Sequence, residues 1–212
     1  MDWLGSVLAV LQAPAFEVAG KAVSRAELLG DVTGGLCVWL VARQNVWNWP
    51  LGLANNVFWI VSFWYARLYA DATLQGVFFV LGCWGWWLWT RPARENAGLV
   101  PRRTSRREWA MLGVATVVAT AGIAVWLGRT TDSPAPLADS SVLTFSLAAT
   151  YGQARKLIES WWIWILVDLI SVPLYVSRGL YPTAALYVVF GILCVVGLRR
   201  WAQELRAGEA IA

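Results

Sequence analysis

The sequence contains no histidine and few charged residues of either sign. Histidine is absent from all 212 positions, and only 14% of the residues are charged. The missing imidazole excludes histidine acid–base catalysis and histidine-ligated metal sites. A soluble domain carries about a quarter charged residues, so a soluble enzyme is disfavoured. Hydrophobic residues make up 58% of the chain, which also holds sixteen tryptophans. We therefore expect an integral membrane protein whose surroundings are the lipid bilayer.

Several signatures of enzymes and cofactor proteins are also missing. The three cysteines stand far apart in apolar stretches without a CxxC pair, so neither a disulfide framework nor a zinc site is expected. No GxxxxGKS/T phosphate loop occurs, which excludes an ATP-driven pump within this chain. The net charge of +4 is explained by arginines in cytoplasmic loops rather than by nucleic-acid binding. We expect no enzyme activity, no cofactor and no metal.

Seven apolar segments, each a candidate membrane-spanning helix, follow a lead-in of residues 1–24. They are Arg25–Ala42, Val46–Ala66, Ala70–Thr90, Glu108–Leu127, Ser140–Ala154, Ile158–Ser177 and Leu180–Trp201. The fifth is the shortest and contains Thr144, Ser146 and Thr150. The lead-in lacks the basic start of a signal peptide and is interrupted by Pro14, so we interpret it as an interfacial helix or a loose lead-in. The predicted fold class is an all-α membrane protein.

Arginines are concentrated in the segment Arg91–Arg107, between the third and fourth predicted spans. It holds six of them, so the positive-inside rule places it in the cytoplasm. Alternating the spans from there puts twelve of the seventeen basic residues inside, the N-terminus outside and the C-terminus inside. We therefore predict a multi-pass protein of the bacterial cytoplasmic (inner) membrane, with a cytoplasmic tail at residues 202–212.

The chain repeats itself after 112 residues. This shift gives twelve identities in 48 aligned positions, among them Trp49 with Trp161, and the charge argument gives both halves the same orientation. Two parallel three-helix units joined by an inverting fourth helix form a transporter architecture, with the substrate near the bilayer midplane between the repeats. The units are predicted at residues 25–90 and 140–201. Residues 91–139 between them form the basic loop, the linker helix and an outer loop.

The sixth span carries a carboxylate near its middle. Five residues recur at spacings of three and four, and therefore share one helical face: Trp161, Trp164, Asp168, Ser171 and Tyr175. A carboxylate at mid-membrane costs at least about 2.5 kcal/mol, so Asp168 must face the interior and find partners. Indoles that stack on a flat ring and a carboxylate that attracts a cation make this face a candidate substrate site. In the alternative, Asp168 bonds neighbouring helices and the tryptophans anchor helix interfaces.

Polar residues on other spans extend the candidate site. Asn55 and Asn56 lie near the centre of the second span, and Trp59 shares the face of Asn55. Gln75 lies near the start of the third span, and its repeat partner is Tyr187 in the seventh. Amides within an apolar span either join helices or bond a substrate, and the sequence leaves both readings open.

Six short motifs stand out, three in each repeat. The first repeat has Trp47-Asn-Trp-Pro-Leu-Gly, Leu68-Tyr-Ala-Asp followed by Gln75, and Gly85-Trp-Trp. The second has Arg155-Lys, Trp161-x-x-Trp164-x-x-x-Asp168 and Gly179-Leu-Tyr. Together, over Glu27 to Trp201, they resemble the PnuC family of bacterial vitamin transporters. The resemblance implies a seven-helix fold like that of a full-length SWEET sugar transporter. It also implies transport of nicotinamide riboside by facilitated diffusion, trapping of the vitamin by cytoplasmic phosphorylation, and homotrimers.

The same resemblance implies substrate contacts for Trp161, Trp164, Asp168, Asn55 and Gln75. Some nicotinamide riboside members have asparagine at the position of Asp168, and the segment around it also looks like riboflavin-carrying relatives. A carboxylate favours the cationic vitamins nicotinamide riboside and thiamine over neutral riboflavin. We therefore expect a nicotinamide riboside transporter, with riboflavin or thiamine as the alternative cargo. The alternative from another class is a membrane scaffold protein with a structural Asp168.

Overall fold

The computed structural model describes residues 2–18, 21–65, 69–91, 99–131 and 134–210. Among them, a long helix coincides with each predicted apolar segment. These are α2 (Arg25–Ala42), α3 (Asn48–Tyr65), α4 (Tyr69–Thr90), α6 (Arg106–Thr130), α7 (Pro136–Ala154), α8 (Ser160–Ser177) and α9 (Tyr181–Glu209). Arg67 and Arg94, which entered the charge argument, lie outside the described residues. The fold is therefore α-helical, as predicted.

Local sequence explains several helix ends. The side chain of Ser105 accepts from the backbone of Glu108, whose side chain accepts from the Ser105 backbone, so a capping box starts α6. Proline stands in the first turn of α7 and of α9, where its missing N–H costs nothing. The helix α9 continues to Glu209, through most of the predicted tail. The tail is too polar to span a membrane, but its alanine, glutamine, glutamate and arginine favour helix.

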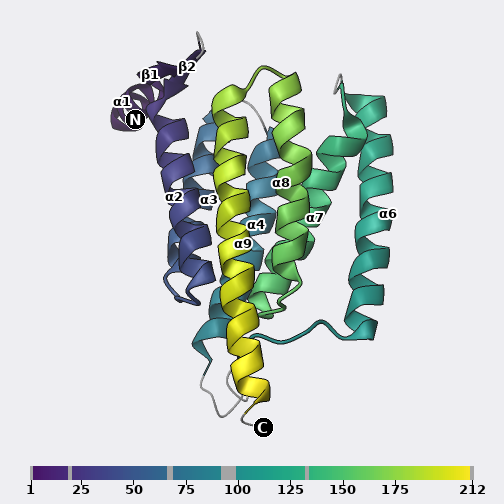
Figure 1. Ribbon diagram of the computed structural model, residues 1–212. Helices are drawn as coiled ribbons and strands as arrows, with labels where there is room; N and C mark the ends of the chain where they lie inside the picture. The colour runs from purple at the N-terminus through teal and green to yellow at the C-terminus, as the bar shows by residue number, and fades with distance from the viewer. Residues whose placement is uncertain (1, 19–20, 66–68, 92–98, 132–133, 211–212) are drawn as a thin grey trace.

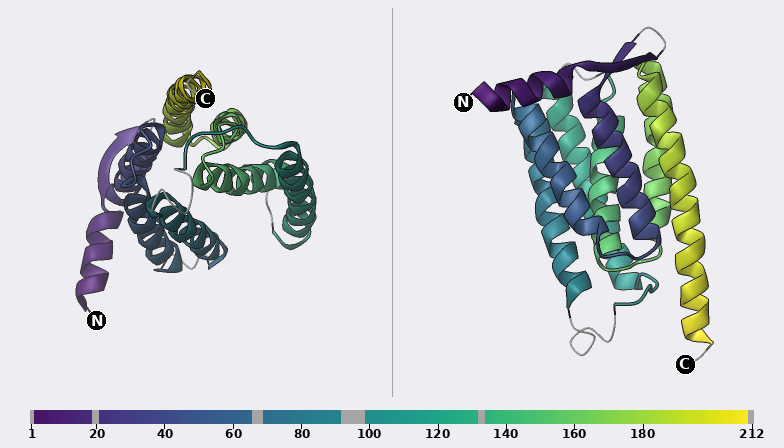
Figure 2. Two further views of the ribbon diagram at one scale, coloured as in Figure 1. Left: turned by 90° about the horizontal axis from the view of Figure 1, so that it is seen from below. Right: turned by 90° about the vertical axis from the view of Figure 1, so that its left-hand side faces the viewer.

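The N-terminal lead-in contains a helix and a hairpin. Helix α1 (Asp2–Gln12) is followed by strands β1 (Pro14–Val18) and β2 (Lys21–Ser24), which pair antiparallel. Figure 2 shows α1 projecting from one end of the bundle, at a steep angle to the long helices. The sequence interpretation missed the strands, because segments of five and four residues are too short for alternation to stand out.

The long helices run side by side (Figure 1), and their packing divides them into two units. In the first unit, α3 packs against both α2 and α4; in the second, α8 packs against both α7 and α9. The units meet where α2 packs on α9 and α4 on α7. Helix α6 packs on α7 and has no buried residue. Each unit therefore has its middle helix at its centre, and two helix pairs join the units.

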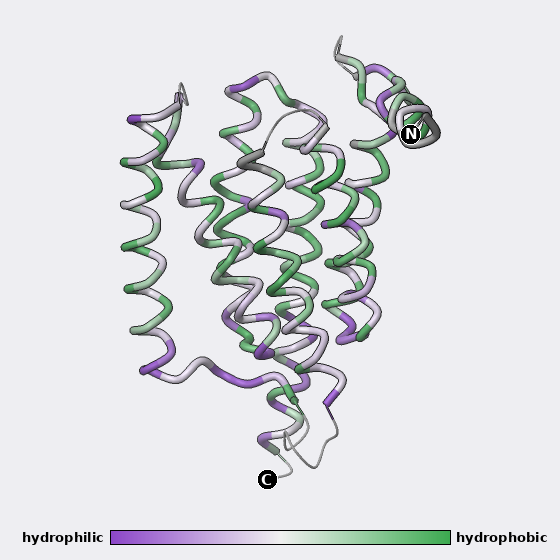
Figure 3. Tube along the Cα trace, turned by 180° about the vertical axis from the view of Figure 1, so that it is seen from behind, coloured by the Kyte–Doolittle hydropathy of each residue, from purple (hydrophilic) through white to green (hydrophobic). Residues whose placement is uncertain are grey.

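Apolar residues cover the helices along their length, and hydrophilic ones gather towards the helix ends and in the segment before α6 (Figure 3). By length and composition, α6, α8 and α9 could each cross a membrane, and Leu28–Ala42 within α2 is a shorter apolar helix. We call the end that carries the hairpin the upper end (top of Figure 1) and the end where α2 and α7 finish the lower end. The largest buried cluster, which includes Trp161 and Trp201, lies among α2, α8 and α9.

Candidate functional site

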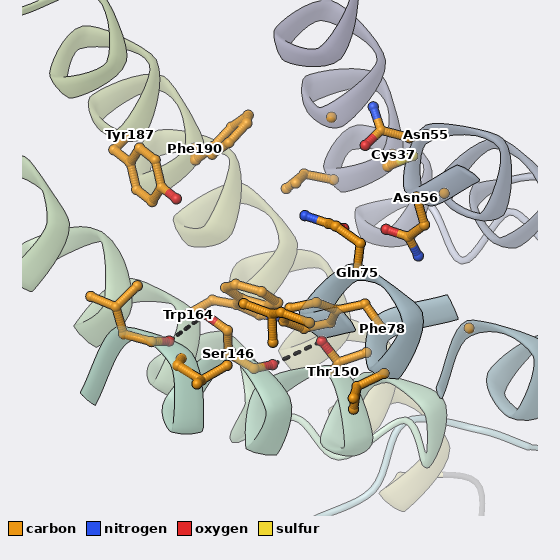
Figure 4. Close-up of a pocket in the computed structure, with 18 of the residues that line it drawn as sticks. Cys37, Asn55, Asn56, Gln75, Phe78, Ser146, Thr150, Trp164, Tyr187 and Phe190 are labelled. Atoms are coloured by element: carbon orange, nitrogen blue, oxygen red, sulfur yellow. Dashed lines mark hydrogen bonds between the residues drawn. The ribbon is translucent and has the colours of Figure 1, made fainter. Parts of the chain in front are cut away.

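A cavity of about 1130 Å³ lies between the two units. Side chains from α2, α3, α4, α6, α7, α8 and α9 line it. Figure 4 shows ten of these side chains by name. Its position between repeats is where transporters of repeated architecture bind their substrates.

Helix α8 contributes Trp164, Asp168 and Tyr175 to the cavity wall. Asp168 is 5% exposed, and its Oδ2 atom has no hydrogen-bond partner among the described residues. The indole Nε1 of Trp164 is likewise buried and unpartnered there. The thiol of Cys194 on α9 lies within hydrogen-bonding reach of the Asp168 carboxyl group. A buried acceptor and a buried donor without partners, one turn apart on a cavity wall, are where a polar ligand would gain most.

The residues of the predicted α8 face have different surroundings at different heights along the helix. Trp161 is fully buried and packs edge to face on Trp201, with ring centroids 5.4 Å apart, so it does not line the cavity. Seven residues separate Trp161 from Asp168, which is about 10 Å along an α-helix. Trp161 therefore points in a similar direction but lies nearer the lower end, beyond the cavity. Ser171 is also fully buried and outside the lining.

The amides of α3 have different surroundings. Asn55 donates from Nδ2 to the carbonyl oxygen of Gly30 and to the hydroxyl of Thr33, so it joins α3 to α2 while also lining the cavity. Asn56 lines the cavity as well. Trp59 does not: its ring packs against Gly30 and stacks on Phe63 with centroids 5.2 Å apart. A substrate can thus reach both amides, whereas Trp59 belongs to the packing between α2 and α3.

Gln75 on α4 and Tyr187 on α9 both line the cavity. Tyr187 packs on Tyr175 with ring centroids 5.1 Å apart, so α8 and α9 present two phenol rings together. The structure therefore brings seven of the ten residues singled out in the sequence to one cavity, and leaves out Trp161, Ser171 and Trp59. The seven are Trp164, Asp168, Asn55, Asn56, Gln75, Tyr175 and Tyr187.

Sequence reasoning did not single out the polar wall formed by α7. Ser146, Thr150 and Gln153 line the cavity, and their spacing of four and three places them on one helical face. The hydroxyls of Ser146 and Thr150 donate to backbone oxygens of α7, which leaves their own oxygens able to accept. Figure 4 shows both hydroxyls beside Trp164 and Phe78. The hydroxyl-rich composition of the fifth span was the signal that could have found this wall.

An ion pair stands at the upper end of the cavity. Arg178, just after α8, donates from one nitrogen to both carboxylate oxygens of Asp139 on α7, at 2.7 and 2.8 Å. Both residues line the cavity. Within the described residues, no group of three or more histidine, cysteine, aspartate or glutamate side chains could hold a metal ion. From the part of the chain that the structure describes, the cavity thus offers the unpaired Oδ2 of Asp168, aromatic rings and a set of amides and hydroxyls.

Comparison with known proteins identifies the family. Residues 24–203 match the family model described as nicotinamide mononucleotide transporter. The chain belongs to this family. It is a membrane transport protein, as the sequence predicted, and the match spans both helical units.

Two curated relatives carry different vitamin names. The riboflavin/roseoflavin transporter RibM of Streptomyces davaonensis is 29% identical over 204 residues, which are 95% of this chain and 92% of that protein. The nicotinamide riboside transporter PnuC of Escherichia coli is 24% identical, over 88% of this chain and 89% of that protein. A crystal structure of the vitamin B3 transporter PnuC matches with a TM-score of 0.67 at 22% identity, covering 86% of this chain and 82% of that one. The structural match supports the family fold.

Proposed function

We propose that this protein carries nicotinamide riboside across the bacterial inner membrane by facilitated diffusion, and that phosphorylation inside the cell traps the vitamin. One observation carries the proposal: Asp168 Oδ2 and Trp164 Nε1 lie on the wall of a cavity between two helical units, and neither has a hydrogen-bond partner among the described residues. Nicotinamide riboside combines a flat cationic ring with an amide and a polar ribose. A carboxylate, an indole and surrounding amides and hydroxyls match those three parts.

Each lining residue has a role in this proposal. The pyridinium ring stacks on Trp164, and Asp168 faces its positive charge. Gln75, Asn55 and Tyr175 bond the carboxamide and ribose, with Asn56 and Tyr187 beside them. Trp161, which was predicted to stack on the pyridinium ring, does not contact the substrate in this proposal, and neither does Trp59. The rings of both pack against other aromatic rings and support the cavity wall.

The proposed arrangement in the membrane follows the charge pattern. Seven spans form two parallel three-helix units of SWEET-like architecture, joined by α6. The lower end, which includes Arg155 and Arg102, faces the cytoplasm, and the N-terminus lies outside. The exposed apolar face of α6 contacts lipid or the neighbouring protomer of a homotrimer.

Counterflow in proteoliposomes tests the transport mechanism. Vesicles loaded with unlabelled nicotinamide riboside should accumulate labelled vitamin transiently, with the same buffer on both sides and no proton or sodium gradient. Vesicles without protein are the control. Accumulation that requires an imposed ion gradient would refute facilitated diffusion, and a lack of counterflow under either condition would refute nicotinamide riboside as the cargo.

Riboflavin is the second candidate cargo, and thiamine the third. The 29% identity to RibM over 95% of this chain favours riboflavin. The carboxylate of Asp168 favours a cation, and thiamine shares that property with nicotinamide riboside. If riboflavin alone shows counterflow, the cargo is riboflavin and the site and fold stand as described.

A further inference from the structure

Four tryptophans, here called the tryptophan hub, gather at the lower end of the bundle: Trp49, Trp89, Trp161 and Trp201. They form two edge-to-face pairs of nearly equal geometry. Trp49 and Trp89 lie 5.5 Å apart at 82°, and Trp161 and Trp201 lie 5.4 Å apart at 87°. Trp89 and Trp201 also contact each other, with centroids 6.4 Å apart. The hub is continuous across both units.

Each pair rests on a glycine of its own unit. A Cβ placed on Gly85 would lie 2.2 Å from a ring carbon of Trp49, and one on Gly197 would lie 2.4 Å from the matching carbon of Trp161. At both positions, only glycine leaves room for the neighbouring indole ring. Adding 112 to the numbers of Gly85 and Trp49 gives Gly197 and Trp161. The two units therefore contain the same contact between a glycine and an indole.

Two hydrogen bonds cross from one unit to the other within the hub. Trp89 Nε1, on the third helix of the first unit, donates to the carbonyl oxygen of Ala154 at the end of α7, at 3.2 Å. Trp201 Nε1, on the third helix of the second unit, donates to the carbonyl oxygen of Val41 near the end of α2, at 3.3 Å. Each unit thus holds the end of the other unit's first helix. The two bonds are reciprocal, although the acceptors differ by one position in the repeat.

The point about which the hub is symmetric is marked by Gln44 and Lys156. They are 112 residues apart, and both have a backbone φ of 52°. Lys156 Nζ donates to Gln44 Oε1 at 2.7 Å and lies 4.6 Å from the ring centroid of Trp89. Residues related by an internal two-fold can touch only close to the axis that relates them. The axis therefore passes through the lower end, next to the hub.

We propose that the tryptophan hub is the closure of the lower end of the cavity, and that its two crossed hydrogen bonds part whenever the cavity opens to that side. The inference rests on the proposed function, in which a solute crosses the bundle between the units. Of the four indoles, only Trp49 lines the cavity; the other three are joined to it by the ring contacts of the hub, which therefore borders the cavity at the lower end of the bundle. Closely packed rings and buried hydrogen bonds are either formed or broken and do not deform continuously. Such contacts are suited to a closure that is either shut or open.

Sided chemical labelling tests the closure without any vitamin. Cys37 lines the cavity and is partly buried. In inside-out membrane vesicles, an impermeant maleimide should modify Cys37 several-fold faster in the double variant Trp89→Phe/Trp201→Phe than in the unaltered protein. Phenylalanine keeps a ring but removes the indole N–H. Peptide mass spectrometry reads Cys37 separately from the other cysteines. The matched control is Trp86→Phe/Trp162→Phe, in which both indoles are exposed.

An unchanged labelling rate in a folded, monodisperse double variant would overturn the proposal. If that variant does not fold, Gln44→Cys/Lys156→Cys supplies the test, because a short, reducible bifunctional thiosulfonate can join the two sites. Cross-linking should slow Cys37 labelling from the lower side and stop counterflow, and reductant should restore both. Labelling that proceeds unchanged through the cross-link would contradict the closure. If labelling responds as predicted but no vitamin binds, the closure stands and the proposed function fails.

Discussion

Asp168 and Trp164 each have one buried polar atom that has no partner among the described residues. Leaving a buried polar group unpaired costs about 1–3 kcal/mol, and a ligand that pairs both atoms recovers that cost on binding. The two residues stand one helical turn apart, so a single small molecule can contact both. At the scale of single residues, this pair differs from the equally unpartnered Trp161 Nε1 and Ser171 Oγ on the same helix because both of its members line the cavity.

Replacing Asp168 by asparagine should separate cationic from neutral cargo. Asparagine keeps the size and a hydrogen-bonding oxygen but removes the negative charge. We expect Asp168→Asn to weaken binding of nicotinamide riboside or thiamine by about tenfold, which corresponds to about 1.4 kcal/mol, and to affect riboflavin much less. Isothermal titration of each vitamin against the purified protein measures this. Equal losses for all three vitamins would contradict a role for the charge.

Adding one methyl group at the hub glycines should destabilise the protein. In Gly85→Ala and Gly197→Ala the new Cβ would fall within 2.2 and 2.4 Å of buried indole carbons. Over-packing of this kind costs about 1–3 kcal/mol, so the thermal midpoint in detergent should fall. The matched control is Gly122→Ala on α6, where a Cβ would meet nothing within 4 Å. If the thermal midpoint falls equally in all three variants, the loss of stability comes from replacing any helical glycine and not from the contact with an indole.

Spacing alone predicted the direction of side chains on α8 but could not predict their depth. The pattern placed Trp161 and Trp164 on one face, and the structure places Trp164 on the cavity and Trp161 in the hub. Whether a residue meets a cavity or a neighbouring indole depends on where along the axis the facing helix supplies a glycine. Gly197 lies on α9, and its position opposite Trp161 follows only from the packing of the helices.

The segment of residues 99–105, here called the strap, fastens α6 to the second unit. Arg102 forms a parallel bridge with Leu157, in which its N–H donates to Lys156 and its carbonyl accepts from Ile158, both at 3.0 Å. The backbone N–H and the hydroxyl of Thr104 both donate to Glu159, at 2.8 and 2.6 Å. Arg102 also pairs with a glutamate in the first turn of α6, which raises the pKa of its guanidinium. The strap therefore fixes the turn before α8.

Removing the acceptor of the strap should loosen this element. Glu159→Ala leaves the N–H and hydroxyl of Thr104 without their partner, so we expect a loss of stability of about 1–3 kcal/mol. Thermal unfolding in detergent, read against Glu209→Ala at the exposed end of α9, measures it. If both variants unfold at the same temperature as the unaltered protein, the strap contributes nothing to stability.

Hydropathy and charge predicted the elements well, because each long helix is an apolar run between polar turns. The same signal missed β1 and β2, which are too short, and the strap, whose bonds are mostly backbone to backbone. Helix α9 also continues beyond the predicted span, because a helix can continue into polar sequence without crossing a membrane. Contacts between elements that are distant in the chain could not be predicted, because hydropathy and charge describe each segment by itself.

On the scale of the whole molecule, the two units enclose a cavity and are joined through α2 with α9 and α4 with α7. At the lower end, two crossed hydrogen bonds join the units, and their donors Trp89 and Trp201 are 112 residues apart. The 112-residue shift was visible in the sequence, but its consequence was not: matching residues such as Gln44 and Lys156 touch each other. In the proposed function, a cavity between two helical units exposes a bound solute to each side of the membrane in turn.

Equilibrium binding of nicotinamide riboside to the purified protein, to Trp164→Ala and to Trp162→Ala tests the central claim most directly. Trp162 is the matched control, because it lies on the same helix and is 59% exposed. Stacking of a base on an aromatic side chain contributes about 1–3 kcal/mol, so Trp164→Ala should bind about tenfold more weakly or worse, while Trp162→Ala binds as the unaltered protein does. Unaltered affinity in Trp164→Ala, or the same loss in both variants, would contradict a binding site on this cavity wall.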